Sequence, residues 1–253
     1  MNTLKRDFLK SLLLNTPDNG IVCAPFLLKQ GFSYENIKQY LRHGYLDSIG
    51  RGAYCKHGNQ PPVASALNAL NEQLDIALHL GGRSALARRG FLHFVPMQEM
   101  KVTLFGSSDE KLPSWFKRYY HERCECRMTG IFNDEAGVDS VEWEGFNVRA
   151  SAPERAILEF ISGVPRNCQL NEVYQIMEMM NTLRPKLLTQ LLEKCSSIQT
   201  KRLFLLLAED IRHGWYDRLD LANVDLGSGC RVVDAGGQYN SKWQVVVKPW
   251  KEI

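Results

Sequence analysis

Two clusters in the middle of the sequence have the side-chain types that bind metal ions. In the first, Cys124 and Cys126 are separated by one residue and follow His121 and Glu122. Structural zinc sites usually space their paired cysteines more widely and draw on a second pair, which this neighbourhood does not supply. We therefore interpret these cysteines as reduced and partly buried, and we predict no metal site here.

The second cluster consists of three carboxylates, Asp139, Glu142 and Glu144, of the kind that bind magnesium. No lysine follows them in the pattern that a nuclease would use. On an alternating strand Glu142 and Glu144 share one face, so a solvated strand face is the preferred interpretation. A DNA-targeted, nuclease-like enzyme stays open as an alternative that rests on these three residues alone.

The remaining sequence shows none of the common catalytic patterns. The six histidines include no pair at helical spacing of the HExxH type, and no phosphate-binding glycine loop or GxSxG sequence occurs. We predict a protein that is not an enzyme, with no catalytic residue, no metal and no cofactor.

A different chemistry is indicated near the N-terminus, where residues 33–43 have a helical pattern that ends at Gly44. Its polar side chains suit a helix in the major groove of DNA. Lysine and arginine bind guanine or phosphate, glutamine binds adenine, and the residues at the helix N-terminus donate to phosphate. The predicted DNA-binding residues of this helix are Ser33, Asn36, Lys38, Gln39 and Arg42.

The other side of this helix is predicted to face the core. Tyr34, Ile37 and Leu41 fall on one stripe and are assigned to packing. An ordinary solvated helix face is the alternative interpretation of the polar stripe.

The elements around this helix have the order of a winged helix-turn-helix. Helical patterns at residues 4–13 and 25–30 precede it, and two short strand patterns at residues 45–49 and 53–56 follow it. The intervening Gly50-Arg51-Gly52 predicts a hairpin, with Arg51 at its tip for a minor groove or a phosphate backbone.

Charge separates this unit from the rest of the chain. Residues 1–60 hold eight Lys or Arg and four Asp or Glu, a net charge of +4, whereas the whole chain has +3, so residues 61–253 have a net charge of −1. Because DNA carries dense phosphate charge, a DNA-binding unit needs such a local excess. We predict DNA binding for this unit, with a protein-interaction adaptor as the alternative, since winged helices also bind proteins.

The whole chain is predicted to be an α+β protein with two units. Residues 57–62 form a polar, proline-containing linker, which gives a winged helix-turn-helix domain at residues 1–60 and a larger mixed α/β domain at residues 61–253. In the larger domain, strand patterns occur at residues 92–95, 101–105, 138–143 and 146–149, and helical patterns at 63–73, 83–89, 152–162, 171–181, 185–195 and 200–213. Residues 230–235 and 243–247 are expected to close the chain as a hairpin.

Composition sets the class and the compartment. Hydrophobic residues make up 44% and charged residues 23%, which excludes wholesale disorder. The chain has no run of about 18 apolar residues and no secretory signal, so no membrane association is expected. Seven scattered cysteines fit a reducing environment, and we predict a cytoplasmic location.

Six segments, in their order along the chain, resemble the AbiEi antitoxins of type IV toxin–antitoxin systems. They lie at residues 43–54, 78–86, 90–96, 151–159, 201–205 and 224–231, and so span nearly the whole chain. One departure is Cys230, where the family pattern has a basic residue. The resemblance implies an N-terminal winged helix and a C-terminal antitoxin domain.

The resemblance also implies two activities and two partners. One is repression of the protein's own operon through inverted repeats in double-stranded promoter DNA. The other is counteraction of a cognate nucleotidyltransferase toxin, which need not form a stable complex with the antitoxin. Arg51 and the polar face of the third helix match the DNA-reading elements of the family. Further basic residues are candidates for additional phosphate contacts or for the antitoxin surface: Arg83, Arg88, Arg89, Lys201 and Arg202. The operator sequence, the oligomeric state and the antitoxin mechanism stay open.

Overall fold

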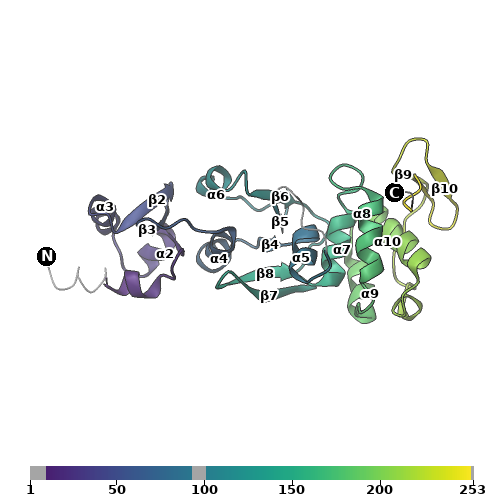
Figure 1. The fold of residues 1–253 in the computed structure, drawn as a ribbon, viewed down its shortest axis with the longest axis horizontal. Helices are drawn as coiled ribbons and strands as arrows, with labels where there is room; N and C mark the ends of the chain where they lie inside the picture. Colours follow the sequence, from purple (N-terminus) through teal and green to yellow (C-terminus); the bar gives the residue numbers. More distant parts are fainter. Residues whose placement is uncertain (1–9, 93–100, 252–253) are drawn as a thin grey trace.

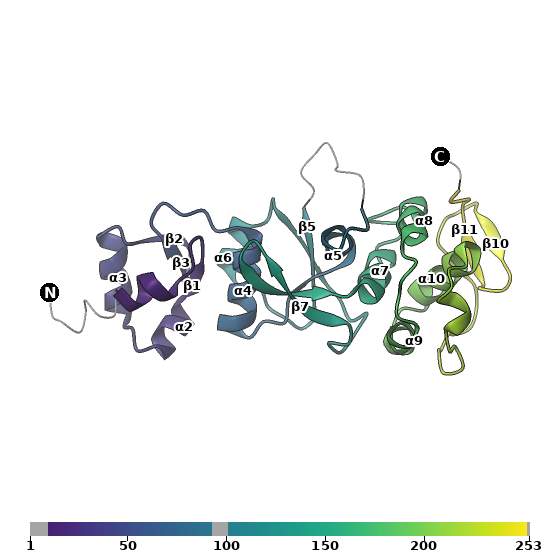
Figure 2. The ribbon, with the colours of Figure 1, turned by 60° about the horizontal axis from the view of Figure 1, so that its bottom comes forward.

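The computed structural model describes residues 10–92 and 101–251 of the chain. The described part is elongated, with the N-terminal unit at one end and the C-terminal helices at the other (Figure 1). A central mixed sheet separates the two ends (Figure 2). The structure confirms the predicted α+β class.

The N-terminal unit contains the second and third predicted helices and the hairpin, together with one strand that was not predicted. Of the first predicted helix, at residues 4–13, residues 4–9 lie outside the described residues. Residues 10–15 are helical. They are followed by β1 (Ile21–Cys23), α2 (Ala24–Lys29), α3 (Tyr34–Arg42), β2 (Leu46–Gly50) and β3 (Ala53–Lys56). All pairings in its sheet are antiparallel, with the order β1-β3-β2. The helices and the sheet enclose a small core that includes Leu12, Val22, Leu27, Ile37 and Leu46.

Helix α4 (Val63–Leu74) joins this unit to the rest of the molecule. The outer edge of β1 forms hydrogen bonds with side chains of α4 rather than with a further strand. The Ile21 amide donates to Ser65 Oγ over 3.0 Å, and the Cys23 amide donates to Gln73 Oε1 over 2.8 Å. Gln73 Nε2 in turn donates to the Ile21 carbonyl over 2.7 Å. The edge strand is therefore covered, and the predicted boundary at residue 60 falls within a packed region.

The predicted linker contains no helix or strand, yet it is held in place. Pro61 is buried, and the Tyr120 hydroxyl donates to its carbonyl oxygen over 2.9 Å. Tyr120 itself is fully buried against Trp115 and Phe116. The division into a domain at residues 1–60 and a domain at residues 61–253 stays a prediction.

The central sheet has the strand order β6-β5-β4-β8-β7. Its strands are β4 (His79–Leu80), β5 (Val102–Gly106), β6 (Cys124–Met128), β7 (Val138–Trp143) and β8 (Phe146–Ser151). Strands β5 and β6 are parallel and connected by α6 (Ser114–Tyr119), while β7 and β8 form an antiparallel hairpin. Helix α4 packs against β8, and α5 (Gly82–Arg88) packs against β5 and against α7 (Pro153–Ile161). The strand pattern at residues 92–95 falls largely outside the described residues.

Four helices follow the sheet: α7 (Pro153–Ile161), α8 (Leu170–Met179), α9 (Pro185–Lys194) and α10 (Ile198–Ile211). A 3-10 turn, η1 (Tyr216–Arg218), leads to β9 (Arg231–Val232), β10 (Gln238–Asn240) and β11 (Val245–Val247). The predicted hairpin between residues 230–235 and 243–247 is wrong. Strand β9 runs parallel to β11, and the antiparallel partner of β11 is β10.

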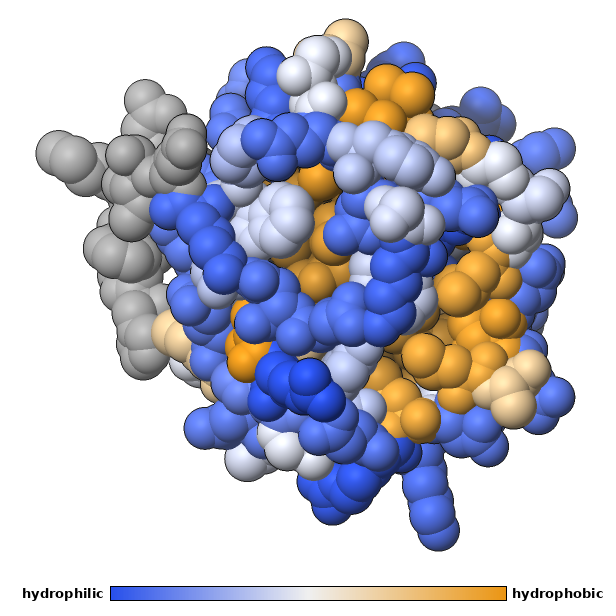
Figure 3. Space-filling model, turned by 90° about the vertical axis from the view of Figure 1, so that its right-hand side faces the viewer, coloured by the Kyte–Doolittle hydropathy of each residue, from blue (hydrophilic) through white to orange (hydrophobic). Residues whose placement is uncertain are grey.

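The C-terminal end of the molecule shows hydrophobic groups lying among hydrophilic ones (Figure 3). Val232 and Tyr239 are among the exposed large hydrophobic residues of the chain. Across residues 10–92 and 101–251, no helix is both long and apolar enough to span a membrane.

Candidate nucleic-acid interface

Helix α3 begins with a reciprocal cap formed by two of the predicted DNA-binding residues. The Asn36 amide donates to Ser33 Oγ over 3.1 Å, and the Ser33 amide donates to Asn36 Oδ1 over 2.9 Å. Such a cap satisfies amide groups that would otherwise lack partners at the helix N-terminus. Ser33 and Asn36 thus have a structural role in fixing where α3 starts.

The outward face of α3 carries the other predicted side chains. Lys38 and Arg42 are exposed and lie four residues apart on one side of the helix, and Gln39 is half-buried beside them. None of the three has an ion-pair or side-chain hydrogen-bond partner among the described residues. Their charged and amide groups are free to bind a ligand.

The inward face of α3 differs from the predicted one at its first residue. Tyr34 is 61% exposed, so its assignment to packing is wrong, whereas Ile37 is 2% exposed and Leu41 is half-buried. Tyr40, which was not among the residues assigned to packing, is buried in the core, where it contacts Phe32 edge to face. Tyr34 is the first helical residue and lies beyond the end of the small core. An aromatic ring is thereby added to the exposed surface beside Lys38.

Arg51 is exposed in the two-residue turn between β2 and β3, as expected. The turn itself has an unexpected neighbour in α6 of the larger unit. A Cβ atom added to Gly50 would lie 2.7 Å from Trp115 Cβ and 3.0 Å from Trp115 Cα. The hairpin therefore packs against α6, and Arg51 lies where the two units meet.

The three arginines around α5 bind other parts of the protein. Arg83 pairs with Glu172 of α8 over 3.0 Å. The Arg89 guanidinium donates to the Ser151 carbonyl over 3.0 Å and to Asp139 over 3.3 Å. Arg88 is exposed, with its guanidinium 5.8 Å from the Trp143 ring centre. These interactions attach α5 to α8, β7 and β8, which is a structural role for all three side chains.

Lys201 and Arg202 are 2% exposed each, so their assignment to a surface is wrong. The Arg202 guanidinium donates to the carbonyl oxygens of Leu226, Gly227, Gly229 and Gln244. It thus orders the glycine-containing loop that precedes β9. Two segments of the family resemblance, at residues 201–205 and 224–231, are joined by this one side chain.

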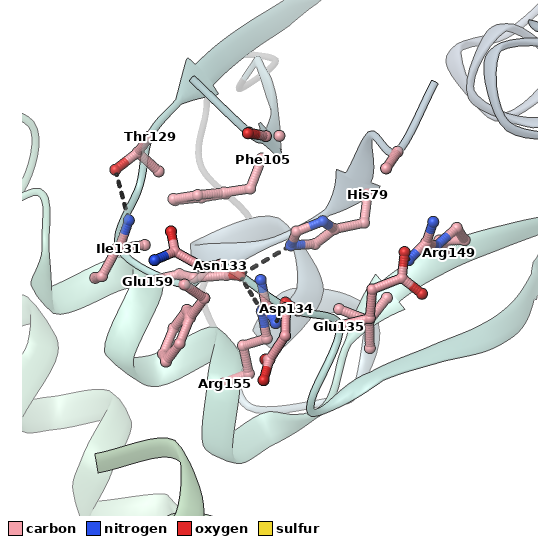
Figure 4. A pocket seen from close by; sticks show the side chains of 15 residues that line it. His79, Phe105, Thr129, Ile131, Asn133, Asp134, Glu135, Arg149, Arg155 and Glu159 are labelled. Atoms are coloured by element: carbon pink, nitrogen blue, oxygen red, sulfur yellow. Dashed lines mark hydrogen bonds and ion pairs between the residues drawn. The ribbon is translucent and has the colours of Figure 1, made fainter. Parts of the chain in front are cut away.

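A buried charged cluster joins two other segments of the resemblance (Figure 4). Glu159 of α7 is fully buried. It accepts from Arg155 Nε, Ser151 Oγ and His79 Nε2 over 2.8 Å each, and from the Gly82 amide over 3.0 Å. Burial raises the pKa of Glu159. The charges and hydrogen bonds of His79 and Arg155 lower this pKa by a larger amount, so the net shift is downward.

A cavity of about 150 Å³ lies beside this cluster, bounded by Phe105, Thr129, Asn133 and Arg149 among others. Four protein groups donate hydrogen bonds to the two oxygens of the Glu159 carboxylate. The cluster is therefore best explained as a satisfied buried network that holds α5, α7 and the central sheet together.

The first turn of α7 contains a second buried carboxylate. Glu154 and Arg155 are both buried but do not pair with each other. Glu154 Oε2 lies 2.9 Å from Arg184 Nη2, and Glu154 Oε1 accepts a further bond from the Arg184 amide. Burial raises the pKa of Glu154, and the Arg184 hydrogen bonds lower it below the ordinary value.

The candidate metal residues are not gathered into a site. Cys124 and Cys126 lie on β6, where burial raises their thiol pKa values to about 12 and about 11. Glu142 is exposed on β7, and Glu144 lies in the following turn instead of on the strand. Among the described residues, no three His, Cys, Asp or Glu side chains are placed to hold a metal ion.

Comparison with known families identifies the chain. Residues 5–97 match the family described as "Transcriptional regulator, AbiEi antitoxin N-terminal domain". Residues 99–248 match the family described as "Transcriptional regulator, AbiEi antitoxin, Type IV TA system". The chain belongs to the AbiEi antitoxin family. The N-terminal match includes α4, the helix that covers the edge of β1, so it extends well past residue 60.

A solved structure shares the fold of this AbiEi protein. The crystal structure of the RV2827C protein from Mycobacterium tuberculosis superimposes with a TM-score of 0.64 at 15% sequence identity, over 97% of this chain and 92% of that chain. No match was found among curated proteins.

Proposed function

We propose that this AbiEi protein represses its own operon by binding inverted repeats in the promoter, and that it counteracts a cognate nucleotidyltransferase toxin in the cytoplasm. The N-terminal unit acts as a winged helix-turn-helix, with α3 as the helix that enters the major groove. Its antitoxin role is supported by the type IV system named in the family description.

The observation that carries the DNA-binding part is the outward face of α3. Lys38 and Arg42 are exposed cations without an ion-pair partner among the described residues, next to Gln39. These are the side chains that recognise guanine, phosphate and adenine. The cap formed by Ser33 and Asn36 fixes the start of the helix and so orients this face.

The direct experiment is a fluorescence-anisotropy titration of the full chain with its own promoter DNA. Wild type should bind, and Lys38→Ala with Arg42→Ala should weaken binding strongly. The magnitude of the slope of log K against log salt concentration should fall by about one for each phosphate that the double variant no longer neutralises. Absence of wild-type binding at low salt would refute the repressor role. The same binding by the double variant would refute α3 as the DNA-reading helix.

The antitoxin part is tested separately by co-expression with the proposed cognate nucleotidyltransferase toxin. Rescue of growth by wild type, and by the DNA-binding double variant, would support an activity that does not depend on repression. Loss of rescue in the double variant would indicate that repression alone protects the cell. Failure of wild type to rescue would refute the antitoxin role.

We propose no catalytic role for the chain. The support is the dispersal of Asp139, Glu142 and Glu144, since Asp139 pairs with Arg89, Glu142 is exposed on β7 and Glu144 lies in the turn after it. Incubation of plasmid DNA with the protein and magnesium should produce no nicking. Nicking that disappears in Glu142→Ala would refute this proposal.

A further inference from the structure

The cavity beside the buried charged cluster has room for one small ring. Its volume is about 150 Å³. Binding sites for drug-sized molecules usually measure about 300–1,000 Å³, whereas a cavity of about 150 Å³ holds one benzene molecule. The ends of β4 and β5 and the loop between β6 and β7 bound this cavity (Figure 4). A single ring therefore fits inside, and a whole nucleotide or a peptide does not.

Buried apolar side chains form much of the cavity wall. Phe105 comes from β5, Ile131 and Phe132 come from the loop after β6, and each of the three is at most 5% exposed. Asn133 and Glu135 of the same loop also line the cavity but are exposed, so they mark its opening to solvent. Apolar and aromatic walls of this kind favour the flat faces of a ring.

Charge on the cavity wall is balanced within the protein. All the Asp, Glu and Arg side chains that line the cavity have ion-pair partners. The pairs are Arg155–Glu159, Arg149–Glu135 and Asp134–Lys194. A charged ligand would lose its hydration and find no opposite charge left to pair with. The cavity therefore favours an uncharged molecule.

Two nitrogen atoms of side chains that line the cavity have no hydrogen-bond partner among the described residues. His79 Nε2 and Arg155 Nε both donate to Glu159 Oε1 over 2.8 Å, which places the two side chains next to each other (Figure 4). Across residues 10–92 and 101–251, no group bonds to His79 Nδ1 or to Arg155 Nη2. Both side chains are 5% exposed, and neither of these nitrogens is completely enclosed. A ligand in the cavity can thus reach both atoms.

The two free nitrogens differ in their hydrogen-bonding roles. Because His79 Nε2 carries the hydrogen that faces Glu159, Nδ1 of the neutral imidazole is an acceptor. The guanidinium of Arg155 can only donate. An acceptor next to a donor is complementary to a ring edge that has an N–H group beside a carbonyl oxygen. Pyrimidine bases such as uracil have this edge, and they are uncharged and consist of one ring.

We infer that the cavity is a binding site for a pyrimidine base, either free or as part of a nucleoside. The faces of the ring lie against Phe105 and Phe132. Its N–H group donates to His79 Nδ1, and its carbonyl oxygen accepts from Arg155 Nη2. In a nucleoside the ribose lies outside, at the opening beside Asn133. The inference goes beyond the proposed DNA binding and does not depend on it, because none of these residues belongs to the N-terminal unit.

Isothermal titration calorimetry of the full-length protein with uracil tests the inference, with two related compounds as ligand controls. Uracil methylated on both ring nitrogens keeps its carbonyl groups but has no N–H group to donate to His79, and adenine has a second ring that exceeds the cavity. Wild type should bind one uracil per chain, and both controls should bind at least about tenfold more weakly, roughly the effect of one lost hydrogen bond. Uridine separates the two sources of the base. Uridine that binds as well as uracil indicates a nucleoside, and binding of uracil without uridine indicates the free base.

A pair of variants locates the binding site. Ala77→Leu adds side-chain volume to the wall of the cavity and should weaken uracil binding at least about tenfold. Ala222→Leu adds the same volume at an exposed position outside the cavity and should bind uracil as wild type does. Lys38→Ala with Arg42→Ala, which removes the proposed DNA contacts, should also leave uracil binding unchanged.

Three results overturn the inference and leave the proposed function intact. They are a wild type that binds no uracil, a wild type that binds either control compound as well as uracil, and an Ala77→Leu variant with wild-type affinity. Circular dichroism of each variant confirms that it is folded. If Ala77→Leu is not folded, the comparison of uracil with the doubly methylated compound decides.

Discussion

Glu159 shows at the scale of one residue how a charge is accommodated in this core. Its carboxylate is fully buried and has four donors, one of which, Arg155, is itself only 5% exposed. Glu159→Gln should reduce the free energy of unfolding by about 3–5 kcal/mol, because it leaves Arg155 buried without a counter-charge. Urea unfolding followed by circular dichroism measures this change.

The control for Glu159 is Glu142→Gln, an exposed carboxylate whose replacement should change stability by less than about 0.5 kcal/mol. Equal stability of the two variants would show that the buried network contributes nothing beyond what a neutral amide provides.

Glu154 adds a prediction about pH. Although burial raises its pKa, the hydrogen bonds from Arg184 bring the pKa of Glu154 below the ordinary value of 4.5. A carboxyl with a lowered folded-state pKa stabilises the fold at higher pH, and this contribution is lost as pH falls through that pKa. Wild type should therefore lose stability more steeply below about pH 4.5 than Glu154→Gln. Unfolding free energies measured from about pH 3 to about pH 7 test this, and parallel curves would contradict it.

The turn of the β2–β3 hairpin gives a prediction at the scale of elements. Gly50 has a φ of 150°, and an added Cβ would lie within 3.0 Å of the Trp115 backbone. Gly50→Ala should destabilise the protein by about 1–3 kcal/mol, because the hairpin and α6 cannot both keep their positions. Gly58→Ala is the matched control, since Gly58 also has a positive φ but nothing within 4 Å of an added Cβ. Thermal unfolding should separate the two variants, and equal losses would show that backbone strain alone decides the effect.

A helix or strand could be predicted from the sequence where its own residues show a clear apolar pattern. Helices such as α4 and α9 carry a full apolar stripe, and their predicted positions agree with the structure within a few residues. Strand β1 has three residues and is stabilised by Ser65 and Gln73, which lie more than 40 residues further along the chain. The three-residue β10 was not predicted either, nor was the parallel pairing of β9 with β11. Local patterns carry no information on such pairings.

The candidate site was predictable where exposure follows from helix geometry. The outward positions of Lys38, Gln39 and Arg42 agree with the structure, because a helix of known phase fixes them. Tyr34 was assigned to the core because helical spacing places it on the same side of α3 as Ile37 and Leu41. It is exposed because it is the first residue of the helix, where no core residues lie opposite it. Lys201 and Arg202 lie in a segment that resembles the family, which suggested a functional surface. Only the tertiary packing shows that both side chains are buried and have a structural role.

At the scale of the whole molecule, the two units share a continuous core. Ile21, Cys23 and Ala53 of the N-terminal sheet belong to the same buried cluster as α4 and the central sheet. The unit at residues 1–60 thus exposes part of its core and the edge of β1 when it is cut from α4. A fragment of this size is already near the lower limit of independent stability.

A fragment of residues 1–60 should therefore fail to unfold cooperatively on heating and should bind promoter DNA far more weakly than the full chain. The reason is that Ser65 and Gln73, which complete the edge of β1, and Trp115, which supports the hairpin, are missing from it. Circular dichroism melting and anisotropy titration of the fragment beside the full-length protein measure both effects. A cooperative melt of the fragment together with full affinity would show that the N-terminal unit is an autonomous domain.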